Sequence, residues 1–506
     1  MIVRRFADLW RAKWVQAGFS LAWIMAVILL PITSLPWLVD LSGATTVAPP
    51  SVIFFLGLAI AWWAPEVLLG KQIIFEIKPF LLFLLVVGIA WAAALFLPVE
   101  PFRGHSIQTE YKEALITVVM AASVYIVTAT WLSQHPQWVK ITMQLINLSG
   151  LVLVAWSLVQ ALYVLLWDGH YANIIYRLQS LVSSRPGDLL FQDRVTGMAF
   201  EPSWLAHQLV LVYLPVWLSA LINGYSAFKW RKGLISLESI LLVSGVFVLF
   251  MSFSRIGWLS FLLALAYLMV LLNINLTHQI KKRLQVGLGS GRGAVFSGFV
   301  STGIILSFGL GYFLMIAGLV WLGARFEPRL ARILTENLST VTGFLDLTNR
   351  LFFAERAVYW TAGLNVFGTY PWLGVGPGNA GLFFSETMPS LGYALTEIMN
   401  MFYRFTFLPN TKSMWIRLLA ETGMIGFTFF ITWLFLVFRS ARLAFKHGTR
   451  EIQVLGLVGQ LALAAYLSEA FSLDSFAMPY IWFCLGLVSA ACVLTRRQHE
   501  SLISPP

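Results

Sequence analysis

The sequence predicts an all-α polytopic membrane protein that crosses the bilayer about twelve times. Of its 506 residues, 58% are hydrophobic and only 11% are charged, whereas soluble domains carry about 25% charged residues. Apolar runs of about 20 residues, the length that spans a bilayer, recur along the whole chain. The expected spans are 18–39, 51–70, 79–98, 113–132, 143–166, 204–223, 234–253, 256–274, 294–322, 414–438, 453–471 and 476–495.

The distribution of Lys and Arg predicts which side of the membrane each loop faces. With the N-terminus in the cytoplasm, more than half of the basic residues fall in short cytoplasmic loops and tails, from Arg4 and Arg5 to Arg496 and Arg497. Such an excess is the rule for cytoplasmic loops. We therefore expect both termini in the cytoplasm, and we attribute the net charge of +11 to topology rather than to a nucleic-acid partner.

Two long polar segments interrupt the spans, and both face outward in this topology. We expect residues 1–322 to hold nine spans and an outer loop, 167–204. Residues 323–413 form a large extracytoplasmic loop, and 414–506 hold the last three spans. The large loop is rich in aromatic residues, which argues against disorder. Leu330, Ile333 and Leu334 recur at helical spacing and predict an amphipathic surface helix. We expect a second helix over about 350–368.

Arg255 stands between two apolar runs with almost no loop around it. An arginine near membrane depth is costly and is a candidate functional residue. The alternative is an arginine that reaches out to the lipid headgroups.

Glu201 precedes Pro202 at the outer start of the sixth span. A carboxylate there suits a helix N-terminus, so Glu201 is either a capping acid or a general base or sugar ligand. Both alternatives stay open. His207, two turns further on, is expected to pack inside the bundle.

Several outward arginines could form a cationic pocket for a diphosphate, because arginine binds phosphate through two parallel hydrogen bonds. Solvated surface charge is the alternative for each of them. Arg417 and Glu421 are spaced to pair on one helix face, which favours a structural role for Glu421, while the role of Arg417 stays open. The candidate cations of the pocket are Arg194, Arg325, Arg350, Arg356 and Lys412.

Three stretches of the chain combine into one pattern. They are Arg194-Val-Thr-Gly-Met-Ala-Phe-Glu-Pro-Ser-Trp204, Phe253-Ser-Arg-Ile-Gly-Trp258, and a closing region that includes Tyr370–Asn379 and Pro409–Gly426. Together they resemble the O-antigen ligase and polymerase superfamily. The order of these stretches and the large loop before the tenth span also match. The resemblance covers roughly residues 190–440.

The resemblance implies a multi-span glycosyltransferase related to the GT-C class, without a metal or other cofactor. Such an enzyme takes a glycan from undecaprenyl diphosphate at the outer face of the bacterial cytoplasmic membrane. It then adds the glycan to another lipid-linked repeat or to a final acceptor. Membrane lipids and other polysaccharide-assembly proteins would be its partners.

The resemblance also assigns roles to residues of this chain. The family's span-end arginine corresponds to Arg255, and its loop arginine to Arg356. With Glu201 as the candidate base, these are the expected catalytic residues. The expected diphosphate- or glycan-binding residues are Arg194, Arg350, Lys412, Asn410, Arg417 and Trp204.

The chain departs from the family pattern at Pro409, where ligase-type members commonly have histidine before the asparagine. This departure favours a polymerase-like member, with a ligase acting on a lipid or protein acceptor as the alternative. A transporter of lipid-linked glycans would also suit many spans and an arginine-lined cavity. Transporters often show internal repeats and broken spans, and neither is clear here.

Overall fold

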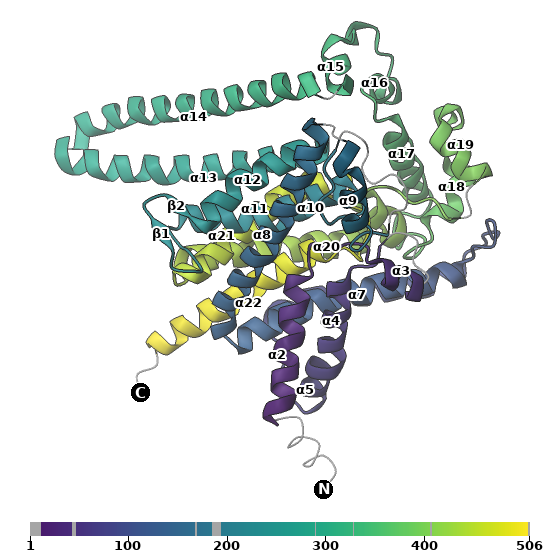
Figure 1. The fold of residues 1–506 in the computed structure, drawn as a ribbon, viewed down its shortest axis with the longest axis horizontal. Helices are drawn as coiled ribbons and strands as arrows, with labels where there is room; N and C mark the ends of the chain where they lie inside the picture. The colour runs from purple at the N-terminus through teal and green to yellow at the C-terminus, as the bar shows by residue number, and fades with distance from the viewer. Residues whose placement is uncertain are drawn as a thin grey trace.

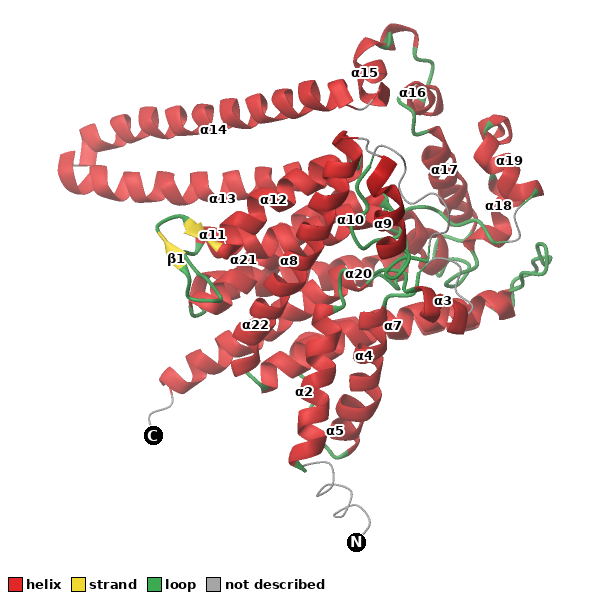
Figure 2. Cartoon of the chain, in the orientation of Figure 1, coloured by secondary structure: helices red, strands yellow, loops and turns green. Residues whose placement is uncertain are grey.

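The computed structural model describes residues 12–42, 47–166, 169–184, 194–288, 290–326, 328–404 and 407–503. Within these ranges ten helices are long and apolar enough to cross a membrane. They are Pro50–Leu68, Phe75–Ala94, Ile107–Gln134 (α7), Gln137–Leu166 (α8), Pro202–Ile222, Arg255–Ile280, Phe299–Arg325, Met414–His447 (α20), Arg450–Glu469 (α21) and Pro479–Ser501. The protein is therefore an all-α polytopic membrane protein, as predicted, and Figure 2 shows how little of it is strand.

Some of these spans are composite or belong to longer helices. α4 (Pro50–Leu58) continues through the wide turn η1 (Ala59–Trp63) into α5 (Ala64–Leu68), η2 (Phe75–Ile77) leads into α6 (Lys78–Ala94), and α10 (Pro202–Gln208) continues through η3 (Leu209–Tyr213) into α11 (Leu214–Ile222). The longer helices are α13 (Arg255–Leu288), α14 (Ser290–Phe326) and α22 (Pro479–Ile503).

The first and seventh predicted spans form shorter helices than the sequence suggested. α2 (Lys13–Ile28) and α12 (Leu237–Met251) have 16 and 15 residues, or about 22–24 Å of helix against a hydrocarbon core of about 30 Å. The predicted span 18–39 was too long. Its helix ends at Ile28, and α3 (Pro36–Ser42) follows as a separate element. Pro31 and Pro36 explain the break, because proline supplies no amide for a continuing helix.

The remaining elements lie outside the membrane-length helices. They are α9 (Gly169–Gln179), β1 (Arg231–Lys232), β2 (Ile235–Ser236), α15 (Pro328–Thr335), η4 (Leu338–Thr340), α16 (Phe344–Arg350), α17 (Ala354–Thr369), η5 (Ala380–Phe383), α18 (Phe384–Thr387), η6 (Ser390–Ala394) and α19 (Thr396–Tyr403). The expected amphipathic helix is α15. The helix expected over 350–368 begins later, at Ala354, since Phe352 has a left-handed φ of 56° that interrupts the helix before it.

The two ends of the bundle differ in what they carry (Figure 1). α15 to α19 gather at one end, while the β1–β2 hairpin, the α13–α14 junction and the C-terminal end of α22 lie toward the other. α13 packs on α21, and α14 runs beside α13 on the outer side of the bundle. Gly323 is the one buried residue of Phe299–Arg325, the span within α14, so in a bilayer that helix faces lipid.

The described residues bury two main apolar cores. The larger core joins the spans and includes the stacked rings of Trp433 and Trp482, whose centroids lie 6.0 Å apart. The smaller core lies within the long loop, where α17 packs on α18 and α19 through residues such as Tyr359 and Phe384. The loop is therefore a folded unit, and it holds its residues in fixed positions above the spans.

Candidate functional site

A cavity of about 540 Å³ lies where the starts of α10 and α13 meet α17 and the segment after α21. Each lining residue lies in a segment that the twelve-span topology puts on one side of the membrane, or in the adjoining end of a span. The lining comprises Arg194, Glu201, Pro202, Ser203, Phe253, Ser254, Arg255, Ile256, Leu259, Ile333, Leu351, Phe353, Arg356, Trp360, Phe471 and Ser472. Four predicted site residues meet here: Arg194, Glu201, Arg255 and Arg356.

Arg255 is the first residue of α13, and backbone carbonyls of the long loop hold its guanidinium. Its Nη1 donates to the Leu351 carbonyl oxygen at 3.2 Å, and its Nη2 donates to that of Phe352 at 3.0 Å. The side chain is half-buried. This geometry differs from an arginine that reaches out to headgroups, because two hydrogen bonds fix the group at the cavity wall.

Gly257 lets α13 approach α10 closely at this point. A Cβ atom at position 257 would lie 2.6 Å from the Cβ of Ala206, so a larger residue would push the two helices apart. The start of α13 borders the cavity through Ser254, Arg255 and Ile256. A helix N-terminus carries partial positive charge, which adds to that of the arginines.

Arg356 enters the cavity from the first turns of α17. Its Nη1 donates a long hydrogen bond, of 3.5 Å, to the carbonyl oxygen of Lys412. Lys412 itself has a left-handed φ of 53°, and its Nζ lies 5.8 Å from the ring centroid of Tyr359. Lys412 thus supports Arg356 through its backbone and is not among the residues that line the cavity.

Glu201 is the N-cap residue of α10, yet its side chain makes no capping hydrogen bond. Its Oε2 instead accepts a hydrogen bond from Ser203 Oγ at 3.2 Å, and the residue lines the cavity with Arg194. The geometry therefore favours a Glu201 that contacts a substrate in the cavity over a Glu201 that caps α10.

Aromatic side chains form a second wall of the cavity. The ring centroids of Trp360 lie 6.2 Å from Phe353 and 5.4 Å from Phe471. Trp360 Nε1 and Ser472 Oγ are buried, and neither has a hydrogen-bond partner within the part of the chain that the structure describes. Buried polar groups are nearly always paired, so these two unpaired groups are candidates for bonding a ligand.

Sequence reasoning missed Trp360, Phe471 and Ser472 as site residues. Phe471 and Ser472 lie between α21 and α22, in a short turn whose position depends on tertiary contacts. Its Ala470 carbonyl accepts from the Met414 amide at 2.7 Å and from Ser413 Oγ at 3.0 Å. The sequence held one indication that this turn belongs to the site: the predicted topology puts it on the same side of the membrane as Glu201 and Arg255.

Arg350 and Arg417 lie outside the cavity and are held by local acids. Arg350 Nε lies 3.2 Å from Asp346 Oδ1, one turn earlier on α16. The Thr342 backbone amide and Arg350 hold the pKa of Asp346 below its ordinary value. Arg417 Nε lies 3.0 Å from Glu421 Oε2, and its Nη1 donates to the Asp474 carbonyl oxygen at 2.7 Å.

The other predicted ligands also lie outside the cavity lining. Asn410 Oδ1 accepts a hydrogen bond from the Lys412 amide at 3.2 Å, which shapes the turn before α20. The ring of Trp204 packs on Phe200 with centroids 5.4 Å apart. Arg325 stacks over Trp321 at 4.1 Å from the ring centroid. Contact of these residues with a substrate stays a prediction.

His207 packs inside the bundle, as expected, where its Nδ1 bonds Glu469 Oε2. The pair joins α10 to the end of α21, directly before the turn that carries Phe471 and Ser472. Its role in the described structure is to fix the floor of the cavity.

The two halves of the closing region bond to each other. α20 is broken at Gly423, whose φ is 64°, and the loop between α17 and η5 docks on the break. The Val375 amide donates to the Ala420 carbonyl oxygen at 2.9 Å, and the Met424 amide donates to that of Pro371 at 2.7 Å. A Cβ at position 423 would lie 2.2 Å from the carbonyl oxygen of Trp372, so only glycine fits.

The comparisons with known proteins agree with this arrangement. Residues 240–431 match the family model described as O-antigen ligase. This match supports the resemblance of the chain to the O-antigen ligase and polymerase superfamily. The match to the O-antigen ligase model includes Arg255 and Arg356 and ends before the Ser472 turn, while Arg194 and Glu201 lie ahead of it. None of the curated proteins compared with the chain matches it.

Proposed function

We propose that this protein is a membrane glycosyltransferase that uses an undecaprenyl-diphosphate-linked oligosaccharide as donor. The observation that supports this proposal most strongly is a cavity lined by three arginines from three separate segments and by one carboxylate. Arg194 precedes α10, Arg255 starts α13 and Arg356 lies in α17. With one glutamate, the three give the cavity a net positive charge that suits a diphosphate.

The proposed reaction replaces one bond to the donor sugar by another. The bond between C1 of the sugar and the diphosphate oxygen breaks, and the acceptor hydroxyl oxygen bonds to C1. The departing diphosphate takes the electron pair, so its negative charge grows in the transition state. Arginines fixed in advance stabilise such charge without reorganising. The two loop carbonyls that hold Arg255 provide that fixation.

Glu201 is the proposed general base. As the acceptor oxygen bonds to C1 it becomes more acidic, and its proton passes to the Glu201 carboxylate. A positioned base of this kind contributes about 10²–10⁴-fold to a rate. Ser203 Oγ, at 3.2 Å, orients the carboxylate.

The aromatic wall is the proposed sugar-binding part of the cavity. Trp360 and Phe471 offer apolar faces to a sugar ring, and Trp360 Nε1 and Ser472 Oγ offer hydrogen bonds to its hydroxyls. The cavity then has a cationic part for the diphosphate and an aromatic part for the glycan. α15, which contributes Ile333 to the lining, is a candidate lid.

The proposal places this cavity on the outer face of the bacterial cytoplasmic membrane, with both termini in the cytoplasm. Its support is the bias of Lys and Arg toward the opposite loops. Residues 1–322 and 414–506 would form the membrane body of a GT-C-like enzyme, and 323–413 the extracytoplasmic loop. No metal or cofactor has a step in this mechanism.

Pro409 favours a polymerase that extends a lipid-linked chain. The second candidate is a ligase that transfers the glycan to a lipid or protein acceptor, and the description of the matched family model favours it.

The test is to incubate the purified protein with an undecaprenyl-diphosphate-linked oligosaccharide, without nucleotide sugar, and to separate the products by length. A ladder supports the polymerase, and transfer only to an added acceptor supports the ligase. If no bond forms with any acceptor, the enzyme proposal fails and a lipid-linked glycan transporter takes its place.

A further inference from the structure

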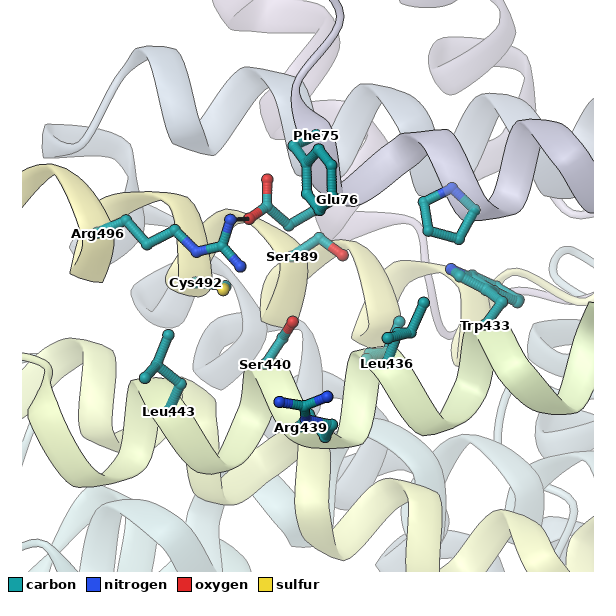
Figure 3. Close-up of a pocket in the computed structure, with 12 residues that line it drawn as sticks. Phe75, Glu76, Trp433, Leu436, Arg439, Ser440, Leu443, Ser489, Cys492 and Arg496 are labelled. Atoms are coloured by element: carbon teal, nitrogen blue, oxygen red, sulfur yellow. Dashed lines mark ion pairs between the residues drawn. The ribbon is translucent and has the colours of Figure 1, made fainter.

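A second cavity, of about 300 Å³, shares no lining residue with the proposed catalytic cavity, and Figure 3 shows it in close-up. It is formed by the turn that precedes α6, by the second half of α20 and by α22. Arg439 and Arg496 line it together with Glu76. The proposed glycosyl transfer does not use any of these residues.

The two cavities lie at opposite ends of the spans. Met414, the first residue of α20, bonds the turn that lines the catalytic cavity, because its amide donates to the Ala470 carbonyl. Arg439 lies 25 residues further along the same helix. α20 is broken at Gly423, and the part beyond the break carries Arg439 16 residues further on, about 24 Å at 1.5 Å per residue against a hydrocarbon core of about 30 Å.

The arginines of the second cavity differ in how they are held. Arg496 Nη1 lies 3.1 Å from Glu76 Oε1, and the Glu76 side chain is 7% exposed. Arg439 has no hydrogen bond or ion pair within the described residues, although it lines the same cavity. Figure 3 shows Arg439 and Arg496 on different helices, one on each side of Ser440. One carboxylate therefore faces two guanidinium groups, which leaves a net positive charge.

The rest of the lining is mostly apolar. Trp433, Leu436 and Val437 precede Arg439 on the membrane-spanning part of α20, so an apolar wall leads from the arginines toward the bilayer interior. Arginine binds phosphate through paired hydrogen bonds, and an apolar wall suits acyl chains. A free phosphate or nucleotide would leave that wall without a partner, whereas a phospholipid matches both parts.

We propose that this second cavity binds the phosphate headgroup of an anionic phospholipid, from the leaflet opposite the catalytic cavity. Basic pockets between spans on the cytoplasmic side take such headgroups in other membrane proteins. The lipid phosphate bonds Arg439 and the outer face of Arg496, and its acyl chains lie along α20. The lipid thus joins α20 to α22 at the end where Glu76 and Arg496 already pair.

The test is native mass spectrometry of the purified full chain, titrated with phosphatidylglycerol, phosphatidylcholine or free glycerol phosphate. We expect one phosphatidylglycerol to bind at least five-fold more tightly than phosphatidylcholine. Arg439→Gln should lose most of this preference, and Glu76→Gln should strengthen phosphatidylglycerol binding by removing the only carboxylate among the lining residues. Arg442→Gln, on the same helix outside the cavity lining, is the matched control.

Three results would overturn the proposal. Equal binding of the two phospholipids, or an Arg439→Gln protein that binds phosphatidylglycerol as tightly as the unaltered protein, would show that the cavity does not recognise an anionic headgroup. Binding of glycerol phosphate as tight as that of phosphatidylglycerol would show that the acyl chains contribute nothing. Arg439 is exposed, so its variant should fold, and retained glycosyl transfer would check this.

Discussion

Arg255 and Phe352 are 97 residues apart in the chain, and a 3.0 Å hydrogen bond from Arg255 Nη2 to the Phe352 carbonyl oxygen joins them. This bond ties the start of α13 to the loop that leads into α17. Arg356 follows Phe352 by one helical turn, so the same contact brings two of the three cavity arginines to one wall.

Arg255→Ala should lower the rate of glycosyl transfer by at least about 100-fold, as expected for loss of a fixed donor that stabilises a leaving group. Arg255→Lys should retain part of the rate, because lysine keeps the charge but lacks the planar guanidinium that donates to both loop carbonyls. The measurement is product formation by purified protein present at equal amounts. Arg177→Ala, an exposed arginine on α9, is the control and should behave as the unaltered protein.

Glu201→Gln should lower kcat by about 10²–10⁴-fold while KM for the donor changes little, since the amide keeps the shape but cannot accept a proton. Steady-state kinetics with a varied donor concentration separates the two constants. A Glu201→Gln enzyme with an unaltered kcat, or one that changes only in KM, would remove Glu201 from the role of base.

Trp360→Phe should raise KM for the glycan donor several-fold without lowering stability. The ring remains, and the substitution removes a buried N–H that has no partner in the described structure, so folding loses no hydrogen bond. Trp360→Leu should raise KM further by removing the aromatic face. Kinetics paired with thermal unfolding tests this, and a loss of stability with unaltered KM would make Trp360 a packing residue.

Gly423→Ala should destabilise the protein by several kcal/mol, about 1–3 kcal/mol from the backbone conformation alone. The new Cβ would lie 2.2 Å from the Trp372 carbonyl oxygen, which would separate the closing loop from α20. Thermal unfolding in detergent measures the effect. Gly303→Ala on α14 is the control, because a Cβ there has no atom within 4 Å.

The packing of α16 against η4 should weaken only at acidic pH, where Asp346 becomes protonated. The pKa of Asp346 lies below its ordinary value of 3.8, because the Thr342 amide and Arg350 favour the charged carboxylate. A lowered pKa in the folded state gives stability that is present above the unfolded value and is lost as pH falls through the folded value. Protease cleavage within 336–350 should therefore stay constant at neutral pH and rise only below about pH 4. Asp346→Asn should remove this acid dependence.

The sequence predicted the helical spans well because apolar length is a local property. The cavity arginines were partly predictable because a local feature, the absence of an acid four residues away, distinguishes them from arginines that pair on their own helix. Arg350 and Arg417 each have an acid four residues away, Asp346 and Glu421, and the structure pairs them there. Arg255 and Arg356 have no acid at that spacing.

The aromatic wall of the cavity could not be predicted in the same way. Phe471 and Ser472 reach the cavity because Ala470 bonds the start of α20, a contact between segments 56 or more residues apart. Their sequence neighbourhood does not reveal that contact. The sequence around Trp360 does not distinguish it from other aromatic residues on helices. Its place in the cavity wall depends on its contacts with Phe353 and Phe471 in the folded chain.

The most direct test of the central claim is to count lipid diphosphate released per glycosidic bond formed, in the unaltered protein and in Arg255→Ala. The account predicts one lipid diphosphate for each new bond in the unaltered protein, and neither product above background in Arg255→Ala. Glycan that remains on its lipid throughout, or equal release by Arg255→Ala, would contradict the claim that this cavity stabilises a departing diphosphate.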